Sequence, residues 1–208
     1  MKKDNEIELD VEYDLVFIID CLPEGEYNDL RISQDLMQYL ADNGIQQTTS
    51  ICRNEKLLIA TLQYLVRLAA SGIKFCLHII SHGDTNGLYI KSTEQEIPWI
   101  KFRNFLKNIN NAMGKTLMLN MTSCLGLHGI KIVDKNSIIH PFFGLIGYSD
   151  DLEVNRAKEI NKLFYQKMVD NKPVNIAVQE IKKELTDDKL YCISAIGYKA
   201  IKNTLNKQ

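Results

Sequence analysis

The sequence lacks the patterns that would assign it to several common classes of protein. Its 208 residues include five cysteines but no Cys-x-x-Cys pair, so neither a disulfide framework nor a zinc ribbon is expected. No phosphate loop of the GxxxxGK[ST] or GxGxxG type occurs, which leaves nucleotide binding without a motif. The net charge is only −1, so no overall field favours nucleic acid or a membrane surface as a partner.

Long apolar runs are also missing. No stretch reaches the roughly 20 residues that a membrane-spanning helix needs, and the N-terminal residues have no apolar core of signal-peptide type. Together with the unpaired cysteines, these absences predict a soluble, cytoplasmic protein. No low-complexity linker or internal repeat divides the chain, so residues 1–208 are expected to form a single domain. Apolar residues make up 45% of the sequence, enough for a substantial core.

Apolar periodicity predicts strands that alternate with helices. Strands are expected at 7–13, 15–19, 47–52, 74–80, 116–121, 142–148 and 190–198, with a small hairpin at 87–97. Helices are expected within 30–43, 54–71, 98–109, 151–170 and 173–185, and segment 125–141 is expected to be a long loop. This alternation indicates an α/β protein with a mostly parallel sheet that helices cover on both faces.

Two of the predicted strands end in small polar clusters that carry a reactive side chain. Strand 74–80 is followed by Ser-His82-Gly83, and strand 116–121 is followed by Thr-Ser123-Cys124-Leu-Gly. Neighbouring parallel strands end at the same edge of an open α/β sheet, so His82 and Cys124 are expected to emerge together there. A thiol beside an imidazole is the smallest set of side chains that a cysteine nucleophile needs.

Cys124 has a different setting from most of the other cysteines. Cys21, Cys76 and Cys192 lie within apolar runs, as buried and unreactive cysteines usually do. Cys124 follows its strand, where small neighbours such as Ser123 let a substrate backbone approach and where a thiolate can be exposed. The backbone N–H groups of Gly83 and Cys124 are the candidates for an oxyanion hole.

These residues resemble the motifs of the caspase-like cysteine peptidases, which include caspases, metacaspases, bacterial caspase-like proteins and CHAT-domain proteins. The likeness lies in Ser-His-Gly after one strand and Ser-Cys-x-Gly after the next, and it spans about residues 10–198. It implies a three-layer α/β/α sandwich around a six-stranded, mostly parallel sheet. It also implies His82 as general base and acid, Cys124 as nucleophile, and the amides of Gly83 and Cys124 as oxyanion donors.

The resemblance further implies a thiol protease, a hydrolase that acts in proteolysis on a protein or peptide substrate. The chemistry needs no metal or cofactor, although some relatives use calcium as an activator. The chain departs from the caspase pattern around the cysteine, because Thr-Ser-Cys-Leu-Gly stands where caspases have Gln-Ala-Cys-Arg-Gly. Leu125 therefore replaces an arginine of the enzymes that cleave after aspartate.

We therefore expect cleavage after Arg or Lys. Ser-Asp150-Asp follows the strand that in the family helps to wall the specificity pocket, and a carboxylate there would pair with a substrate cation. Asp20, at the end of another central strand, is a second candidate for the wall of the specificity pocket. Ser123 is a further candidate substrate-binding residue. The simpler interpretation of Asp150 is that it caps the following helix.

Other interpretations of these residues stay open. Cys76, His78 and His82 share one face of a strand, but ligands spaced about 6.5–7 Å apart do not suit zinc, so no metal is expected. His128 and His140, in the long loop, are alternative bases. The chain could instead be a catalytically silent caspase-like scaffold that binds a regulatory protein partner through this loop. A generic hydrolytic or nucleotide-binding α/β domain is disfavoured because the phosphate loop is missing.

Overall fold

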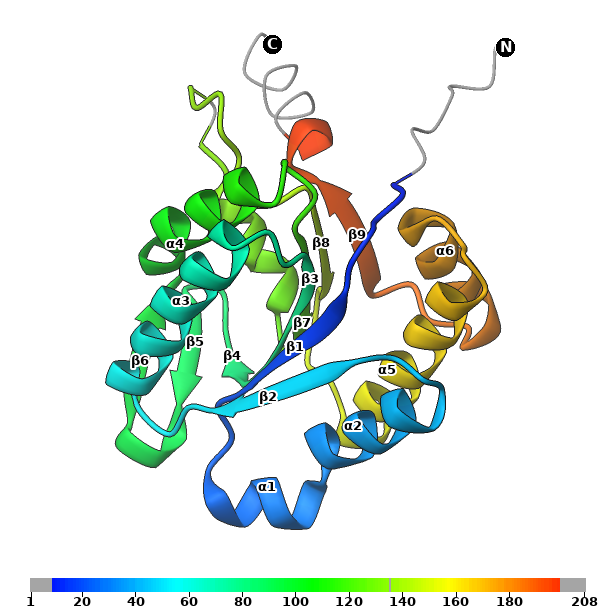
Figure 1. Ribbon diagram of the computed structural model, residues 1–208. Helices are drawn as coiled ribbons and strands as arrows, with labels where there is room; N and C mark the ends of the chain where they lie inside the picture. Colours follow the sequence, from blue (N-terminus) through cyan, green and yellow to red (C-terminus); the bar gives the residue numbers. More distant parts are fainter. Residues whose placement is uncertain (1–8, 135, 199–208) are drawn as a thin grey trace, which may run out of the picture.

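Six strands form one sheet at the centre of the computed structural model, which describes residues 9–134 and 136–198 (Figure 1). The strands lie in the order β2 (Gln47–Ile51), β1 (Leu15–Asp20), β3 (Phe75–Ile80), β7 (Met118–Thr122), β8 (Gly144–Tyr148) and β9 (Leu190–Ser194). The first five are parallel, and β9 runs antiparallel to β8. The four inner strands are buried almost throughout, which explains their continuous apolar sequences.

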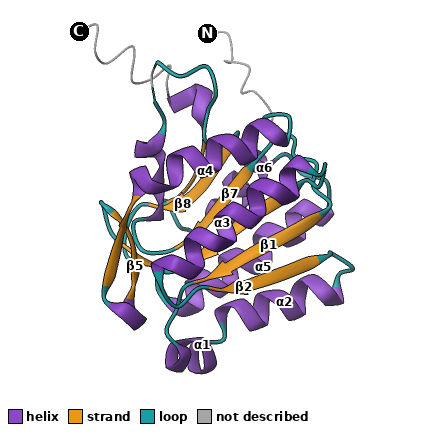
Figure 2. Cartoon of the chain, turned by 60° about the vertical axis from the view of Figure 1, so that its left-hand side comes forward, coloured by secondary structure: helices purple, strands orange, loops and turns teal. Residues whose placement is uncertain are grey.

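Helices cover both faces of this sheet (Figures 1 and 2). One face packs against α2 (Ile32–Asp42), α5 (Val154–Val169) and α6 (Val174–Glu184). The other packs against α3 (Glu55–Ala70), α4 (Trp99–Ala112) and the 3-10 helix η2 (Gly126–Ile132). The predicted α/β sandwich with a six-stranded, mostly parallel sheet is therefore confirmed.

A second, small antiparallel sheet branches from the end of β3. It consists of β4 (His82–Gly83), β5 (Gly87–Ile90) and β6 (Gln95–Pro98), with the short helix η1 (Lys91–Thr93) between the last two. The hairpin predicted at 87–97 is confirmed. The added finding is that His82 itself pairs with Tyr89 in this sheet, so the small sheet holds the backbone of the candidate base.

Three helices begin at residues that the sequence predicted, namely α3 after Asn54, α4 after Pro98 and α6 after Pro173. The Asn54 side chain accepts a hydrogen bond from the Leu57 amide and begins α3, and Gly72, just past its end, has a φ of 94°. The helix expected within 30–43 is α2. The sequence did not predict α1 (Glu24–Leu30), which ends just before α2 where Arg31 has a left-handed φ of 52°.

Two other predictions are wrong in the described residues. Residues 9–13 form no strand, because the backbone of Leu9 bonds to the start of α6 instead. Its N–H donates to Asn175 Oδ1 and its carbonyl accepts from the Val174 amide, both at 3.0 Å. Ile7 lies outside the described residues. The helix expected from residue 151 begins only at Val154, and no side chain caps it.

The segment 125–141, which was predicted to be a loop, begins with a helix. This helix, η2, packs closely on β8. A Cβ placed on Gly147 of β8 would lie only 2.5 Å from the Leu127 amide nitrogen, so the helix and the strand are in backbone contact. This packing carries the chain from the Cys124 end of the sheet back along the face of β8.

Candidate active site

The carboxyl ends of β3 and β7 bring His82 and Cys124 to one cavity. Ile80 and Thr122 are partners in register, and the Ser81 amide donates to the Thr122 carbonyl at 3.2 Å. The two chains therefore leave the sheet side by side. A cavity of about 70 Å³ opens where they diverge, and both His82 and Cys124 line it. The structure thus brings together the two residues that the sequence predicted to meet.

The turn after β7 presents the Cys124 thiol. Leu125 adopts a left-handed φ of 53°, and its amide donates to the Asp150 carbonyl at 2.9 Å. The Leu152 amide donates to the Cys124 sulfur at 3.3 Å. Cys124 is half-buried, whereas Cys21, Cys52 and Cys76 are fully buried. Cys124 is therefore the cysteine that combines access with a position at a strand end.

Burial makes the other thiols poor nucleophiles. It raises the pKa of Cys76 to about 12 and that of Cys192 to about 12. It also raises the pKa values of Cys21 and Cys52. Because the thiolate is the reactive form of cysteine, these four groups are protonated at neutral pH and weakly reactive.

Gly83 lies directly against the cysteine turn. A Cβ on this residue would stand 3.0 Å from the Cys124 carbonyl oxygen and 3.3 Å from the Ser123 Cβ. Contacts of 3.0–3.4 Å are tighter than nine in ten real Cβ contacts, so a side chain here would require the neighbouring atoms to move by a few tenths of an ångström. The close packing of β4 on the cysteine turn therefore favours glycine at this position.

A carboxylate that sequence reasoning missed completes the surroundings of His82. Glu26 Oε2 lies 2.6 Å from His82 Nε2, and its Oε1 accepts from Lys91 Nζ at 2.6 Å. Burial raises the pKa of Glu26, but the hydrogen bonds from Lys91 and His82 outweigh it, and the pKa lies below its ordinary value. The ionised carboxylate accepts a hydrogen bond from Nε2–H, so neutral His82 has Nδ1 as its basic nitrogen.

The predicted specificity carboxylates do not line the cavity. Asp20 is fully buried, and it accepts from Ser33 Oγ at 2.6 Å and from the Leu22 amide at 2.9 Å. Burial raises the pKa of Asp20 although these bonds oppose it. Asp150 is exposed and pairs with Lys189 Nζ at 2.5 Å. Asp150 therefore neither caps α5 nor faces Cys124, and Asp20 serves the packing of α2 on β1.

Ser123 does line the cavity, as predicted for a substrate-binding residue. It is 3% exposed, and within the described residues its hydroxyl has no hydrogen-bond partner. The remaining walls are mainly aliphatic. The aliphatic residues are Leu22, Leu30, Ile32, Ile80, Leu152, Val154 and Ala157, and Ser81 and Thr122 also line the cavity. The cavity beside the candidate nucleophile is thus mainly apolar, with His82 and Cys124 as its titratable groups.

A buried polar chain lies behind the strand end that carries Cys124. His78 Nε2 is 2.9 Å from Thr122 Oγ1, and Thr122 donates its hydroxyl proton to Asn161 Oδ1 at 2.9 Å. His78 Nε2–H must therefore donate to Thr122, while Nδ1 accepts from Tyr165 Oη at 2.9 Å. Burial lowers the pKa of His78 to about 3. His78 is a neutral structural residue, not a metal ligand or a base.

The other two histidines lie away from the cavity. His128 is on η2, and burial and Lys131 lower its pKa while Asp84 opposes them. The His140 carbonyl accepts from Asn110 Nδ2 at 2.9 Å. Neither histidine is among the residues that line the cavity at Cys124, so the structure favours His82 over both as a partner of the thiol.

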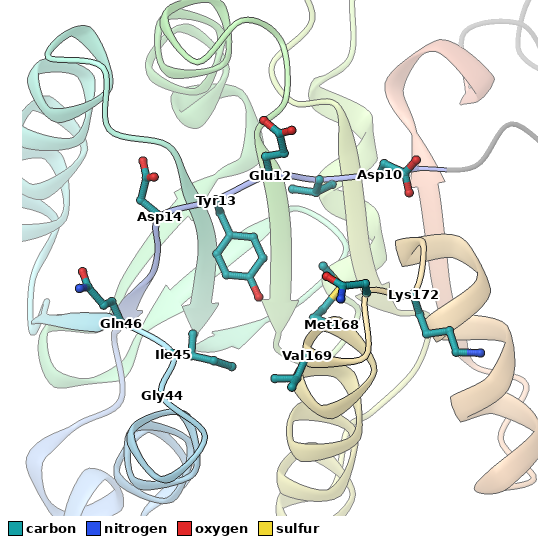
Figure 3. Close-up of a pocket in the computed structure, with 12 residues that line it drawn as sticks. Asp10, Glu12, Tyr13, Asp14, Gly44, Ile45, Gln46, Met168, Val169 and Lys172 are labelled. Carbon is teal, nitrogen blue, oxygen red and sulfur yellow. The ribbon is translucent and has the colours of Figure 1, made fainter.

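A larger cavity of about 770 Å³ lies at the opposite, amino-terminal edge of the sheet (Figure 3). Its wall includes the segment from Asp10 to Asp14. Figure 3 shows the Tyr13 ring directed between Ile45 and Val169, while the carboxylates of Glu12 and Asp14 point the other way. This alternation of sides explains the strand-like sequence pattern of a segment that forms no strand. Among the described residues, no group of three or more His, Cys, Asp or Glu could hold a metal.

Comparison with known proteins adds no relative. No protein-family model matches the chain, and a search of curated proteins finds no match. Within the described residues, no helix has the length and apolar character needed to cross a membrane. What the residues do must therefore be argued from the site itself.

Proposed function

We propose that the chain is a cysteine endopeptidase with a caspase-like fold. One observation carries the proposal. An accessible thiol and an imidazole follow adjacent parallel strands and line the same cavity. The order of the strands, the antiparallel β9 and the small sheet that carries His82 are compatible with the fold that the motifs imply. The free state of all five cysteines supports the cytoplasmic location that we propose for it.

The mechanism follows from the two side chains. Cys124 transfers its thiol proton to His82 Nδ1, and the sulfur attacks the carbonyl carbon of the scissile peptide. The backbone amides of Gly83 and Cys124 are the candidate donors to the oxyanion that forms. The C–N bond then breaks, and the imidazolium returns the proton to the leaving amine. Water, deprotonated by His82, hydrolyses the thioester and releases the acid and the free thiol.

The cavity supports a different substrate side chain from the one expected. Preference for Arg or Lys rested on Asp150 and Asp20, and neither lines the cavity. The walls of the cavity are mainly aliphatic, so they suit an apolar side chain. We therefore propose that the residue before the scissile bond is apolar.

Cleavage of a peptide library by the purified protein tests the function and its specificity together. Wild type should cleave, and Cys124→Ala should not. Matched substrates with Ala, Val, Arg, Lys and Asp before the scissile bond then compare the two preferences. Faster cleavage after Arg or Lys would contradict the apolar assignment, and no cleavage by a folded wild type would contradict the enzyme.

The alternative function is a catalytically silent scaffold that binds a regulatory protein partner. One observation favours it, because Ile138 in segment 133–141 is 87% exposed and offers an apolar side chain to a partner. A thiol-reactive peptidyl probe separates the two functions. A scaffold would show no faster labelling of Cys124 than of a small-molecule thiol, whereas a peptidase would show saturable labelling.

A further inference from the structure

We infer that Glu26 is a positioning residue that holds the His82 imidazole in the tautomer and orientation needed to take a proton from Cys124. The inference rests on the proposed function. It concerns a residue that neither the motifs nor the predicted strand ends indicated, since Glu26 lies 56 residues before His82. Figure 1 places α1, which carries Glu26, at the same edge of the sheet as β4.

Both carboxylate oxygens of Glu26 are engaged. His82 Nε2 approaches Oε2 at 2.6 Å, and Lys91 Nζ donates to Oε1 at 2.6 Å. The two partners come from β4 and η1 of the small sheet. The Glu26 side chain is 23% exposed, so it lies mostly out of the solvent. Two donors from one sheet hold the carboxylate against rotation, and it in turn holds the imidazole ring.

The contact decides which nitrogen is the base. A carboxylate can only accept, so Nε2 carries the proton of neutral His82 and Nδ1 carries the lone pair. Nδ1 then accepts the thiol proton, and the imidazolium that forms has its positive charge beside an ionised carboxylate. An opposite charge at this range favours the charged form of histidine. Glu26 therefore stabilises both the starting tautomer and the charged state that follows it.

The charged and titratable groups that the described residues place at this contact include its own members and two neighbours. Glu26 contacts His82 and Lys91, Tyr89 pairs with His82 in the small sheet and lies near Lys91, and Cys124 shares the cavity with His82. Glu26→Gln removes the charge but keeps the size of the side chain. Lys91→Met removes the second hydrogen-bond donor to Glu26 and leaves the carboxylate in place. Glu24→Gln is the matched control, because Glu24 is an exposed acid in the first turn of the same helix.

Two measurements test the inference. In the first, the ring ¹⁵N resonances of neutral His82 are recorded by NMR, with His82→Asn used for assignment among the four histidines. In wild type the proton should lie on Nε2, and Glu26→Gln should move part of it to Nδ1, because the glutamine amide can also donate. Lys91→Met should change the tautomer less, and Glu24→Gln should leave it unchanged. This readout does not depend on peptidase activity.

The second measurement is turnover of a cleaved peptide as a function of pH. Glu26→Gln should lower kcat about tenfold to a hundredfold with little change in KM, because the group acts on proton transfer. Glu26→Asp should restore part of the loss. An unchanged His82 tautomer in folded Glu26→Gln overturns the inference. A changed tautomer in a protein that cleaves no peptide supports the contact and instead rejects the proposed function.

Discussion

Acidification should destabilise the protein through His78, the buried histidine behind the Cys124 turn. Burial lowers the pKa of His78 to about 3, whereas a histidine in the unfolded chain titrates near 6.5. Between these values the unfolded chain binds more protons than the folded one. Stability that depends on His78 is therefore complete above about pH 7 and falls as the pH drops below the unfolded value.

The expected loss of stability follows from the difference between the pKa values of His78 in the folded and the unfolded protein. From pH 7 to pH 5, protonation of the unfolded His78 lowers the free energy of unfolding by about 2 kcal/mol. The figure changes little as long as the pKa in the folded state stays below about 4, because His78 then remains neutral in the folded protein at both pH values. Urea denaturation at pH 7 and pH 5 measures the loss.

His78→Gln isolates the contribution of this residue. Glutamine can still donate and accept hydrogen bonds but does not titrate, so the variant should lose about 2 kcal/mol less than wild type between the two pH values. His128→Gln is the control, because His128 is only half-buried on η2, and it should retain most of the wild-type loss. Equal losses in wild type and His78→Gln would refute the reasoning.

Four further substitutions test the packing and the electrostatics of the site. Gly147→Ala should lower the free energy of unfolding by about 1–3 kcal/mol, because its Cβ would strike the backbone of η2. Gly25→Ala has open space and should be neutral or stabilising in a thermal denaturation series. Gly83→Ala should fold but lower turnover, since its Cβ requires β4 or the cysteine turn to move by a few tenths of an ångström. Asp150→Asn should leave the cleavage preference unchanged, because the Asp150 carboxylate already pairs with Lys189.

Local patterns in the sequence predicted most of the fold. Continuous apolar runs marked the inner strands, because these strands are buried on both faces. Asn54, Pro98 and Pro173 marked the beginnings of three helices. The helix α1 could not be predicted in this way, since it buries no residue and has no helical spacing of apolar side chains. The prediction of a strand over residues 9–13 was wrong because acidic and apolar side chains also alternate in an extended segment that forms no strand.

The sequence predicted only those parts of the candidate site whose positions follow from the order of the strands. His82 and Cys124 meet because each follows one of two neighbouring parallel strands, and sequence reasoning can anticipate that. Glu26 could not be predicted, because its contact depends on how α1 packs beside the small sheet. The pairing of Asp150 with Lys189 likewise joins separate segments across the surface. Side-chain contacts between segments distant in the sequence leave no local pattern.

The most direct test of the central claim is the site and rate of covalent labelling by a peptidyl electrophile. Brief treatment of the folded protein, followed by mass spectrometry of its peptides, compares all five cysteines in one experiment. We predict rapid, saturable labelling of Cys124, and at least about a hundredfold slower labelling of Cys124 in His82→Ala. Predominant labelling of any other cysteine, or labelling of Cys124 at the same rate in His82→Ala, would contradict the account.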